Sequence, residues 1–255
     1  MMVLAINSGN EFTDIGVFES DKLTYKAQFV TPSACTADEY TVKLLSMSGE
    51  KKSFDGAVIA DVSDIGAGVI KSAVKKFVGS GKVVVIGPGV KTGLNIRIDN
   101  PAALGANLVA AAAGAMLNYG YPVIIADMAA ASAFTVIDGN GVVRGGALVP
   151  GFSLSLRALS DNTAQLPRVH VNETASYSVL GTNTESCMKS GIVYAAAAVI
   201  DGFVRRYRAV IGEDAPTILT GSYASIASKY CEEQVKIDSS LALVGLAAIY
   251  RRNIP

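Results

Sequence analysis

The chain carries a short apolar segment that ends in a polar turn at residues 4–10, Leu4-Ala5-Ile6-Asn7-Ser8-Gly9-Asn10. A second segment of this kind stands at residues 123–129, Val123-Ile124-Ile125-Ala126-Asp127-Met128-Ala129. Apolar runs that end in small and polar residues are typical of strands that enter a tight turn. Because helical patterns follow both segments, we predict an α/β protein made of two similar halves.

Local signals place a hairpin after each segment and divide the chain into two domains. Asp138-Gly139-Asn140-Gly141 supplies the positive φ angles that a tight hairpin turn requires. The hairpins are predicted over residues 14–18 with 23–29 and over residues 134–137 with 142–148. The predicted domains are residues 1–118 and 119–255.

Helices are predicted from capping residues and apolar spacing. Asn100-Pro101 matches an N-cap followed by proline, and it predicts an alanine-rich helix that runs to about Asn118. Thr182 and Glu185 match a capping box ahead of a long helical pattern. The residues expected to share a face of that helix are Met188, Ile192, Ala195, Val199, Phe203 and Tyr207.

Composition argues against several classes of protein. The 22 basic side chains balance the 22 acidic ones, so neither nucleic acid nor an anionic membrane is an expected partner. The longest unbroken apolar runs are shorter than the ~18 residues that suggest a membrane span. Met1 leads into a strand without a signal-peptide pattern, so we expect a cytoplasmic protein. Three cysteines without a C-x-x-C pair are expected to be reduced structural thiols.

A loop rich in glycine and proline precedes the predicted alanine-rich helix. It reads Gly87-Pro88-Gly89-Val90-Lys91-Thr92-Gly93-Leu94-Asn95-Ile96-Arg97-Ile98-Asp99-Asn100-Pro101, which does not match the P-loop pattern. Its composition indicates a special backbone path beside a helix N-terminus, where free N–H groups favour an anionic ligand.

This loop and several shorter motifs resemble the type III pantothenate kinase family over nearly the full chain. The shorter motifs are Thr36-Ala37-Asp38-Glu39-Tyr40, Gly145-Gly146, Pro150-Gly151, Leu166-Pro167-Arg168-Val169, Gly181-Thr182-Asn183-Thr184, Ser190-Gly191, Asp201-Gly202 and Thr220-Gly221. The resemblance implies the duplicated ribonuclease-H-like fold of the hexokinase and actin superfamily. It also implies a dimer with pantothenate pockets at its interface, and ATP-dependent phosphorylation of pantothenate towards coenzyme A. The cofactors implied are ATP, Mg²⁺ and a monovalent cation, K⁺ or NH₄⁺.

Both phosphate motifs that the resemblance implies are altered in this chain. The family's D-x-G-N-T reads Asn7-Ser8-Gly9-Asn10-Glu11, so an amide replaces the carboxylate of the metal region and Glu11 adds a negative charge where a triphosphate approaches. The family's D-x-G-T-A-T-T reads Asp127-Met128-Ala129-Ala130-Ala131-Ser132-Ala133. Asp127 is either a surviving cation ligand or a buried carboxylate with backbone partners, and Ser132 keeps one hydroxyl of the three family threonines.

The resemblance also implies a catalytic base and a residue that acts on the other subunit. The base is the Asp of G-A-D-R, which reads Gly105-Ala106-Asn107-Leu108 here. Asn107 cannot accept a proton from the substrate hydroxyl, and loss of a general base typically lowers the rate ~10² to 10⁴-fold. Thr184 matches a family threonine that reaches into the pantothenate pocket of the other subunit, although a first-turn position explains the residue on its own.

These departures predict a degenerate subunit that pairs with an active paralogue and lends Thr184 to that partner's substrate pocket. One alternative is a stand-alone kinase that forms a homodimer. In this kinase Asp127, Asp99 or Asp61 would bind the metal ion or act as the general base. Another alternative is a non-enzymatic sensor that binds pantothenate, coenzyme A or another acidic metabolite. A hydrolase triad is not expected, because the single histidine, His170, has no nucleophile motif around it.

Overall fold

The structure of the protein is a computed structural model that describes residues 1–49 and 53–254. It divides into two compact units, of which the first holds Met1–Asn118 with Ser240–Pro255 and the second holds Tyr119–Ser239. The predicted second domain runs to residue 255, whereas the chain from Ser240 onward lies in the first unit. Packing of the last helix explains this difference.

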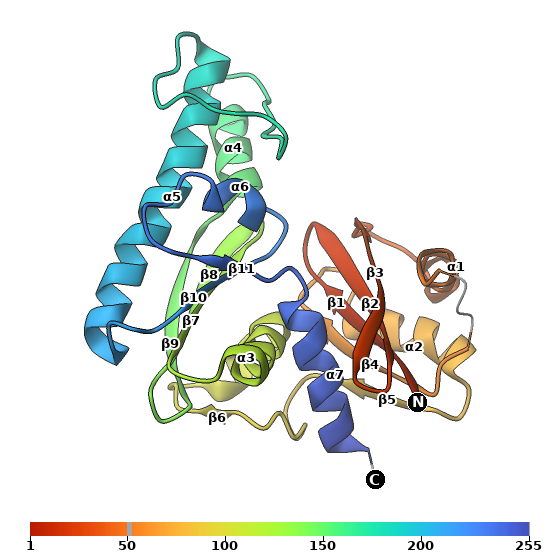
Figure 1. Ribbon diagram of the computed structural model, residues 1–255. Helices are drawn as coiled ribbons and strands as arrows, with labels where there is room; N and C mark the ends of the chain where they lie inside the picture. Colours follow the sequence, from red (N-terminus) through yellow and green to blue (C-terminus); the bar gives the residue numbers. More distant parts are fainter. Residues whose placement is uncertain (50–52, 255) are drawn as a thin grey trace. The chain divides into compact units, whose positions relative to one another are not determined.

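The first unit is a sheet with helices on both faces (Figure 1). Its strands run in the order β3-β2-β1-β4-β5, with an antiparallel meander from β1 to β3 and parallel pairing of β1, β4 and β5. The strands of this sheet are β1 (Met2–Ser8), β2 (Phe12–Glu19), β3 (Lys22–Val30), β4 (Gly56–Asp61) and β5 (Lys82–Val85). The short β6 (Asn95–Ile96) is not part of this sheet. The helices are α1 (Ala37–Met47), α2 (Ala67–Val78), the 3₁₀ turn η1 (Pro101–Ala103), α3 (Ala106–Tyr119) and α7 (Leu241–Asn253).

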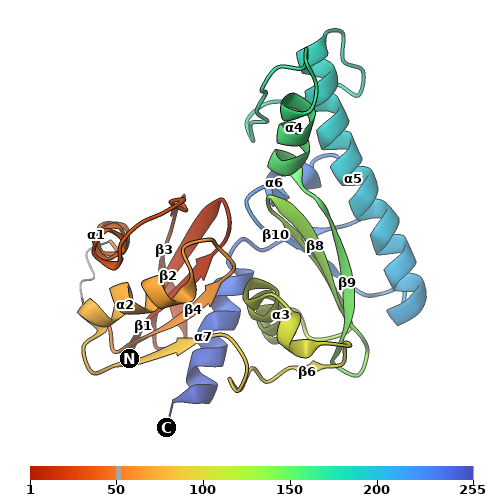
Figure 2. The same ribbon diagram turned by 180° about the vertical axis from the view of Figure 1, so that it is seen from behind.

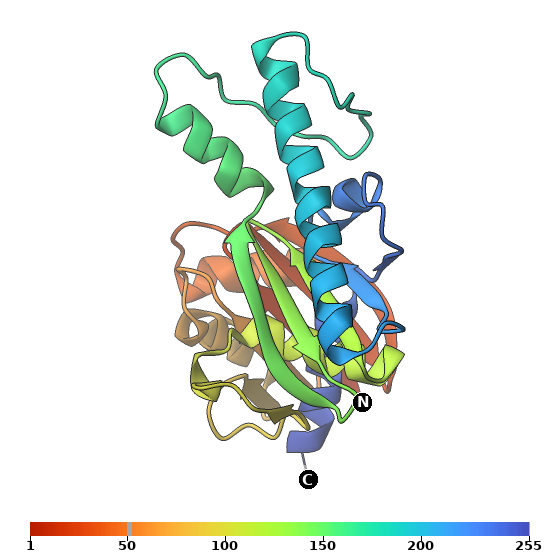
Figure 3. The ribbon, with the colours of Figure 1, turned by 90° about the vertical axis from the view of Figure 1, so that its left-hand side faces the viewer.

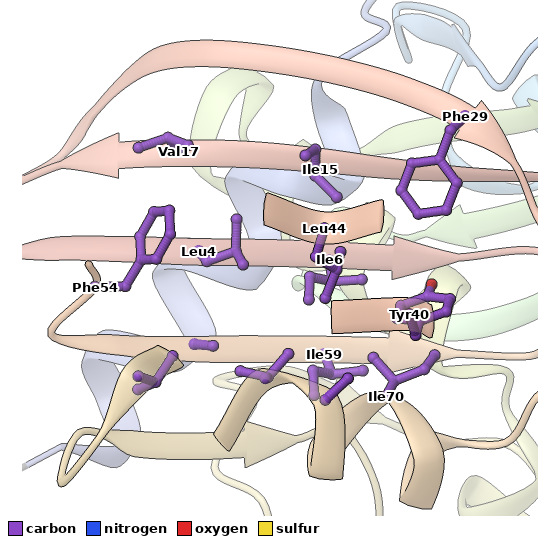
Figure 4. Close-up of a cluster of buried hydrophobic side chains, with 14 residues drawn as sticks. Leu4, Ile6, Ile15, Val17, Phe29, Tyr40, Leu44, Phe54, Ile59 and Ile70 are labelled. Carbon is purple, nitrogen blue, oxygen red and sulfur yellow. The ribbon is translucent and has the colours of Figure 1, made fainter. Parts of the chain in front are cut away.

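Alternation along the strands builds two apolar layers in this unit. Leu4 and Ile6 of β1 point toward α1 and α2, where Tyr40 and Leu44 complete a fully buried cluster (Figure 4). The residues between them point to the opposite face, which the helices α3 and α7 cover (Figure 2). Side chains alternate between the two faces of a strand, so successive residues of β1 belong to the two apolar layers in turn.

Two glycines explain why α7 belongs to the first unit. A Cβ on Gly245 of α7 would lie 1.8 Å from the carbonyl oxygen of Ala110 in α3, and a Cβ on Gly114 would lie 2.0 Å from the carbonyl oxygen of Leu241. The two helices therefore cross with their backbones in contact, which no larger residue at these positions allows. The remaining apolar face of α7, with Leu246, packs onto the sheet.

The second unit repeats the strand arrangement of the first. Its strands run in the order β11-β10-β7-β8-β9, with an antiparallel meander from β7 to β9 and parallel pairing of β7, β10 and β11. The strands are β7 (Val123–Met128), β8 (Ala131–Ile137), β9 (Val142–Pro150), β10 (Thr217–Thr220) and β11 (Lys236–Ile237), and the helices are α4 (Phe152–Asp161), α5 (Thr184–Ile211) and α6 (Ala224–Ser228). The predicted duplication and both predicted hairpins are confirmed.

The long helix α5 lies across one face of the second sheet (Figure 3). Its buried stripe contains Val193, Ala197, Ile200 and Val204, so it is rotated from the predicted face. Of the residues predicted for that face, Met188 is buried, Ala195 is exposed, and the others, Ile192, Val199, Phe203 and Tyr207, are partly buried. By length and composition it is also the one helix in the described chain that is apolar enough to cross a membrane. Because its apolar stripe is buried against the sheet, we assign α5 as a core helix.

Two predicted helix starts are wrong by a few residues. Asn183, and not Thr182, caps α5, and its side chain accepts from the Ser186 amide at 2.9 Å while the Ser186 hydroxyl bonds back to the Asn183 amide at 3.0 Å. Pro101 opens only the 3₁₀ turn, and the alanine-rich helix begins at Ala106.

Candidate functional site

Asn7 stands near the end of β1, directly before the turn of the first hairpin. The Gly9 amide donates to the Phe12 carbonyl oxygen at 3.0 Å, and the Glu11 carbonyl oxygen accepts from the Thr31 amide at 2.8 Å. The turn is therefore held by its backbone. Its side chains are the exposed Asn10 and the half-buried Glu11, so it presents an amide and a carboxylate at the end of the strand.

A polar row crosses the three antiparallel strands at this end of the sheet. Asn7 of β1 is opposite Asp14 of β2, which is opposite Gln28 of β3. Gln28 Nε2 donates to Asp14 Oδ1 at 2.9 Å, and the Asn7 side chain also donates to the Asp14 carboxylate. Burial raises the pKa of Asp14, against the opposing effects of Lys26 and the two amides. Among the described residues, no group bonds the buried Oδ1 of Asn7.

The opposite face of the same strands carries a buried cluster of hydroxyl groups. Thr13 Oγ1 lies 2.9 Å from Thr31 Oγ1 and 3.3 Å from both Ser8 Oγ and the Tyr40 hydroxyl oxygen. Ser8, Thr13 and Tyr40 are fully buried, and burial raises the pKa of Tyr40. Each hydroxyl is satisfied by another, so the cluster forms a connected polar network inside an apolar layer.

This network ends at Asp61, one of the carboxylates considered above as a substitute base. Ser8 Oγ donates to Ser63 Oγ at 3.1 Å, and the hydroxyl and amide of Ser63 donate to Asp61 Oδ1 at 2.6 and 3.1 Å. Asp61 also acts on the pKa of Tyr40 and is paired with Ser8 in the ladder of β1 and β4. Asp61 thus belongs to the face of the sheet that carries α1, opposite to α3.

The segment Gly105-Ala106-Asn107-Leu108 begins α3. The side chain of Asn107 turns back over Gly105, because its Oδ1 lies 2.8 Å from the position that a Cβ on residue 105 would take. Gly105 also faces Val62, which follows β4 and whose amide donates to the Ser8 carbonyl oxygen at 2.9 Å. The ends of β1 and β4 therefore meet the start of α3, which brings Asn7 and Asn107 to one edge of the first unit.

The glycine-rich loop is held by the last turn of α7. Asn253 Oδ1 accepts from the Lys91 amide at 3.0 Å, and Asn253 Nδ2 donates to the Lys91 carbonyl oxygen at 2.9 Å. Gly93 adopts a φ of +78° and lies against the Arg252 guanidinium, 2.7 Å from where a Cβ would be. Asp99 is exposed near the end of the loop. Lys91 and Asn253 are 162 positions apart in the sequence. A distant segment of the chain thus helps to set the path of this loop.

In the second unit Asp127 and Ser132 lie on opposite faces of the sheet. Asp127 of β7 is paired with Ala133 of β8. The fully buried Ser132 is paired with Met128, which belongs to the apolar cluster between the sheet and α5. The Asp127 carboxylate lies against Gly221, whose φ is +87° and whose Cβ, if present, would be 2.4 Å from Asp127 Oδ1. Ser132, the one hydroxyl kept in this motif, is therefore on the opposite face of the sheet from the Asp127 carboxylate.

Thr184 is the first residue of α5 and is exposed. The chain before it packs tightly onto the helix, since a Cβ on Gly181 would lie 2.4 Å from the Cys187 amide nitrogen. The Ser190 hydroxyl fixes the same segment by donating to the Val179 carbonyl oxygen at 2.7 Å. The fold thus presents the hydroxyl of Thr184 on a rigid first turn at the end of the helix.

The residues present do not fit a triphosphate. Glu11 places a carboxylate in the first turn, and the second turn, at residues 129–131, has only alanine side chains. Asp127 is not part of any group of three or more metal-binding side chains within the described parts of the chain.

Sequence reasoning did not find Asp14, Arg252 or Asn253. Asp14 was detectable, because the register of a tight hairpin after Ser8 places residue 14 opposite residue 7. The contacts of Arg252 and Asn253 with the loop had no local signal, because they depend on where α7 packs.

Comparison with known proteins identifies the family. Residues 3–206 match the family model described as type III pantothenate kinase. The type III pantothenate kinase of Bifidobacterium longum (strain DJO10A) is 35% identical over 258 residues, which cover 99% of this chain and 100% of the relative. That of Halalkalibacterium halodurans is 34% identical over 257 residues, with coverage of 99% and 100%.

Solved structures agree on the fold at low sequence identity. A conserved Baf family protein from Campylobacter jejuni is similar with a TM-score of 0.62 at 15% identity, covering 98% of both chains. The activator of 2-hydroxyisocaproyl-CoA dehydratase from Clostridium difficile, with bound ADPNP, is similar with a TM-score of 0.51 at 11% identity, covering 98% of this chain and 94% of that one. The fold is the duplicated ribonuclease-H-like fold of the hexokinase and actin superfamily, as predicted. With a family model matched over most of its length and relatives that are 34–35% identical from end to end, this chain belongs to the type III pantothenate kinase family.

Proposed function

We propose that this chain is a non-catalytic subunit of a type III pantothenate kinase, which pairs with an active paralogue and completes that partner's substrate pocket. The assembly phosphorylates pantothenate with ATP in the biosynthesis of coenzyme A. The observation that carries the proposal is Asn107, which puts an amide where the family has its general base. An amide oxygen accepts hydrogen bonds but is too weak a base to take up a proton at neutral pH, so the family's base position in this chain cannot activate the substrate hydroxyl.

Of the three carboxylates weighed in the sequence, Asp61 and Asp99 lie in the same unit as Asn107, and Asp127 lies in the other. Asp61 lies on the other face of the sheet, where the hydroxyl and amide of Ser63 occupy its Oδ1. Asp99 is exposed near the end of the glycine-rich loop. A stand-alone kinase would have to recruit Asp99, Asp127 or a released Asp61 in place of Asn107, which makes it the weaker candidate.

The two phosphate turns support the same proposal. Phosphoryl transfer depends on positive charge and hydrogen-bond donors around the phosphates. Glu11 repels a triphosphate, and the alanine side chains of the second turn donate no hydrogen bonds. In the proposed assembly the nucleotide is therefore bound by the paralogue, and this chain contributes from outside the paralogue's nucleotide site.

An apolar surface near Thr184 supports contact with another subunit. The exposed apolar residues of α4 and of the segment before α5 are Leu154, Leu159, Val179 and Leu180, with exposed fractions of 41%, 40%, 62% and 77%. In Figure 3 α4 and the first turns of α5 extend together beyond the end of the sheet. Neighbouring exposed apolar residues of this kind favour a protein interface. The partner subunit would cover them and receive the Thr184 hydroxyl.

The proposal is tested by measuring pantothenate phosphorylation with this chain alone, with its paralogue alone and with the two co-expressed, together with the mass of each assembly. We expect full activity only in a mixed assembly. In that assembly Thr184→Ala should raise the KM for pantothenate, whereas Thr182→Ala, an exposed threonine of the same segment, should not. A homodimer of this chain that turns over would support the stand-alone alternative, and ligand binding without turnover in any sample would support the sensor.

A further inference from the structure

A cleft of about 650 Å³ lies at the last turn of α5 in the second unit. It is lined by Arg208, by residues 213–217 and by residues 233–236. We propose that this α5-terminal cleft binds an aliphatic amine of the polyamine class. The inference concerns the second unit alone and does not rest on the partner-subunit proposal.

The α5-terminal cleft is separate from the sites described above. Thr217 begins β10, whereas Thr220 ends this strand beside Asp127, and Gly221 follows it. The cleft is therefore at the opposite end of β10 from the second phosphate motif. In Figure 1 the last turn of α5 and the chain that leads into β10 also lie at the other end of the unit from α4 and from the start of α5, which carries Thr184.

The cleft is lined in part by a buried threonine whose hydroxyl group has no partner. Thr217 is 1% exposed, and nothing in residues 1–49 or 53–254 forms a hydrogen bond with its Oγ1. The side chain lies on the α5 face of β10, because Leu219, two residues further along the strand, belongs to the apolar cluster under α5. A buried polar group without a partner is uncommon in native proteins and calls for a bound water or ligand.

One wall of the cleft is a balanced set of charges. Arg208 Nη1 donates to Glu233 Oε2 at 2.5 Å, and Arg208 Nε donates to the Ala215 carbonyl oxygen at 3.1 Å. Arg205 lies 3.6 Å from the other carboxylate oxygen of Glu233. The buried Asp201 holds the same segment, because it accepts from the Glu233 amide at 3.0 Å. Two arginines and two carboxylates leave this wall rigid and without net charge.

The entrance of the cleft adds negative charge. Glu213 and Asp214 follow the end of α5, are exposed, and form no ion pair within the described chain. The C-terminal end of a helix also carries a partial negative charge. Lys236 is a lining residue as well, but Val235 before it packs with the α5 cluster, so alternation directs the Lys236 side chain to the opposite face. The α5 side of the cleft therefore favours a cation.

The size and the side chains of the cleft suit an organic cation. No group of three or more side chains that could hold a metal ion occurs among the described residues. Sites for small organic molecules have volumes of roughly 300 to 1,000 Å³. Ammonium groups would pair with Glu213 or Asp214 at the entrance and donate to Thr217 Oγ1 inside. The lining residues Pro216 and Val235 offer apolar contact to the methylene carbons between these ammonium groups.

The test titrates the full-length chain with spermidine by isothermal titration calorimetry, without nucleotide or pantothenate. We expect one saturable site per chain with a dissociation constant of about 1 mM or lower. Asp214→Asn should weaken the binding about two- to fivefold, which is the range for one exposed ion pair. Glu173→Gln removes an exposed carboxylate of the same unit outside the cleft and should leave the affinity unchanged. Glutarate, a dicarboxylate with a short apolar stem, should not bind.

Thr217→Val separates a ligand-binding role of the hydroxyl group from a structural one. The variant keeps the shape of the side chain and should weaken spermidine binding about two- to tenfold through the loss of one hydrogen bond. Its unfolding midpoint without spermidine should not fall, because the hydroxyl bonds no described residue. Absence of saturable binding, unchanged affinity in Thr217→Val, equal effects of Asp214→Asn and Glu173→Gln, or tighter binding of glutarate overturns the proposal. Such a failure leaves the partner-subunit proposal untouched, since no second subunit is present.

Discussion

The side chain of Asn253 bonds both main-chain groups of Lys91, accepting from its amide at 3.0 Å and donating to its carbonyl oxygen at 2.9 Å. Asn253, at the end of α7, thus bonds the backbone of the glycine-rich loop in the way that a neighbouring strand would. Val90, Leu94 and Ile96 of the loop also pack against Val109, Ala113 and Ile249, and these contacts, the two bonds and the packing of Gly93 on Arg252 together set the path of the loop.

Loss of this side chain should loosen the loop. We expect Asn253→Ala to lower the free energy of unfolding by about 1 to 3 kcal/mol, since its two bonds to the Lys91 backbone and its bond to the Ile249 carbonyl oxygen are removed. Amide hydrogen exchange of the loop should become faster at Lys91 and its neighbours. The matched control is Lys91→Ala, which keeps both main-chain bonds and should stay within about 0.5 kcal/mol of the parent in urea denaturation. Unchanged exchange in Asn253→Ala would show that the loop is held elsewhere.

The crossing of α3 and α7 should not tolerate a side chain at its centre. In Gly245→Ala the new Cβ would lie 1.8 Å from the Ala110 carbonyl oxygen, and relief requires that two backbones separate. We expect a loss of about 3 kcal/mol or more in the free energy of unfolding. Gly68→Ala in α2, where a Cβ meets nothing within 4 Å, should instead be neutral or stabilising by about 0.5 to 1 kcal/mol. Equal effects of the two variants in thermal unfolding would contradict the close crossing.

The buried hydroxyl cluster should be sensitive to its central member. Thr13→Val keeps the shape of the side chain but leaves the hydroxyls of Ser8, Thr31 and Tyr40 without a shared partner. We expect a loss of about 2 to 4 kcal/mol, since each unsatisfied buried group costs about 1 to 3 kcal/mol. Thr24→Val on the exposed part of β3 removes one hydrogen bond, to the Val17 carbonyl oxygen at 3.2 Å, and serves as the control, with an expected change of about 1 kcal/mol or less in denaturant unfolding. A mild effect of Thr13→Val would mean that water enters the cluster.

Stability should fall at acid pH partly through the cap of α1. The Thr36 backbone amide, and then its hydroxyl, donate to Glu39 and lower the pKa of this carboxyl. A carboxyl whose pKa is lower in the folded state stabilises the fold above its unfolded pKa, and the contribution is lost as the pH falls through the folded value. Glu39→Gln should therefore flatten the dependence of the melting temperature on pH between about pH 5 and pH 3. An unchanged slope in Glu39→Gln would contradict this account.

Local sequence was sufficient where one turn decides the structure. The Asp138-Gly139-Asn140-Gly141 turn and the two repeated strand segments predicted the hairpins, and through them the duplicated sheets. The capping of α5 was missed by one residue because Thr182 and Asn183 are both good N-caps, and the Ser186 hydroxyl pairs with Asn183. Competition between neighbouring caps is decided by the backbone that enters the helix, which the sequence does not display.

Tertiary placement was beyond the sequence where two distant segments share a contact. The position of α7 depends on Gly114 and Gly245 being opposite each other, and neither glycine signals its partner. The same distinction, between what the sequence predicts and what needs the tertiary structure, applies to the candidate site. Losses at positions 7 and 107 were visible as residue types, whereas Asp14 became significant only once its register with Asn7 was known.

The central claim is that this chain does not phosphorylate pantothenate by itself. The most direct measurement is the rate of phosphopantothenate formation by the purified chain, with ATP and Mg²⁺ and with mass spectrometry confirming that no paralogue is present. We expect no turnover above the background without protein, because Asn107 cannot serve as the base. A rate typical of metabolic kinases, about 1 s⁻¹ or faster, would contradict the account and would require another carboxylate of this chain to carry the chemistry.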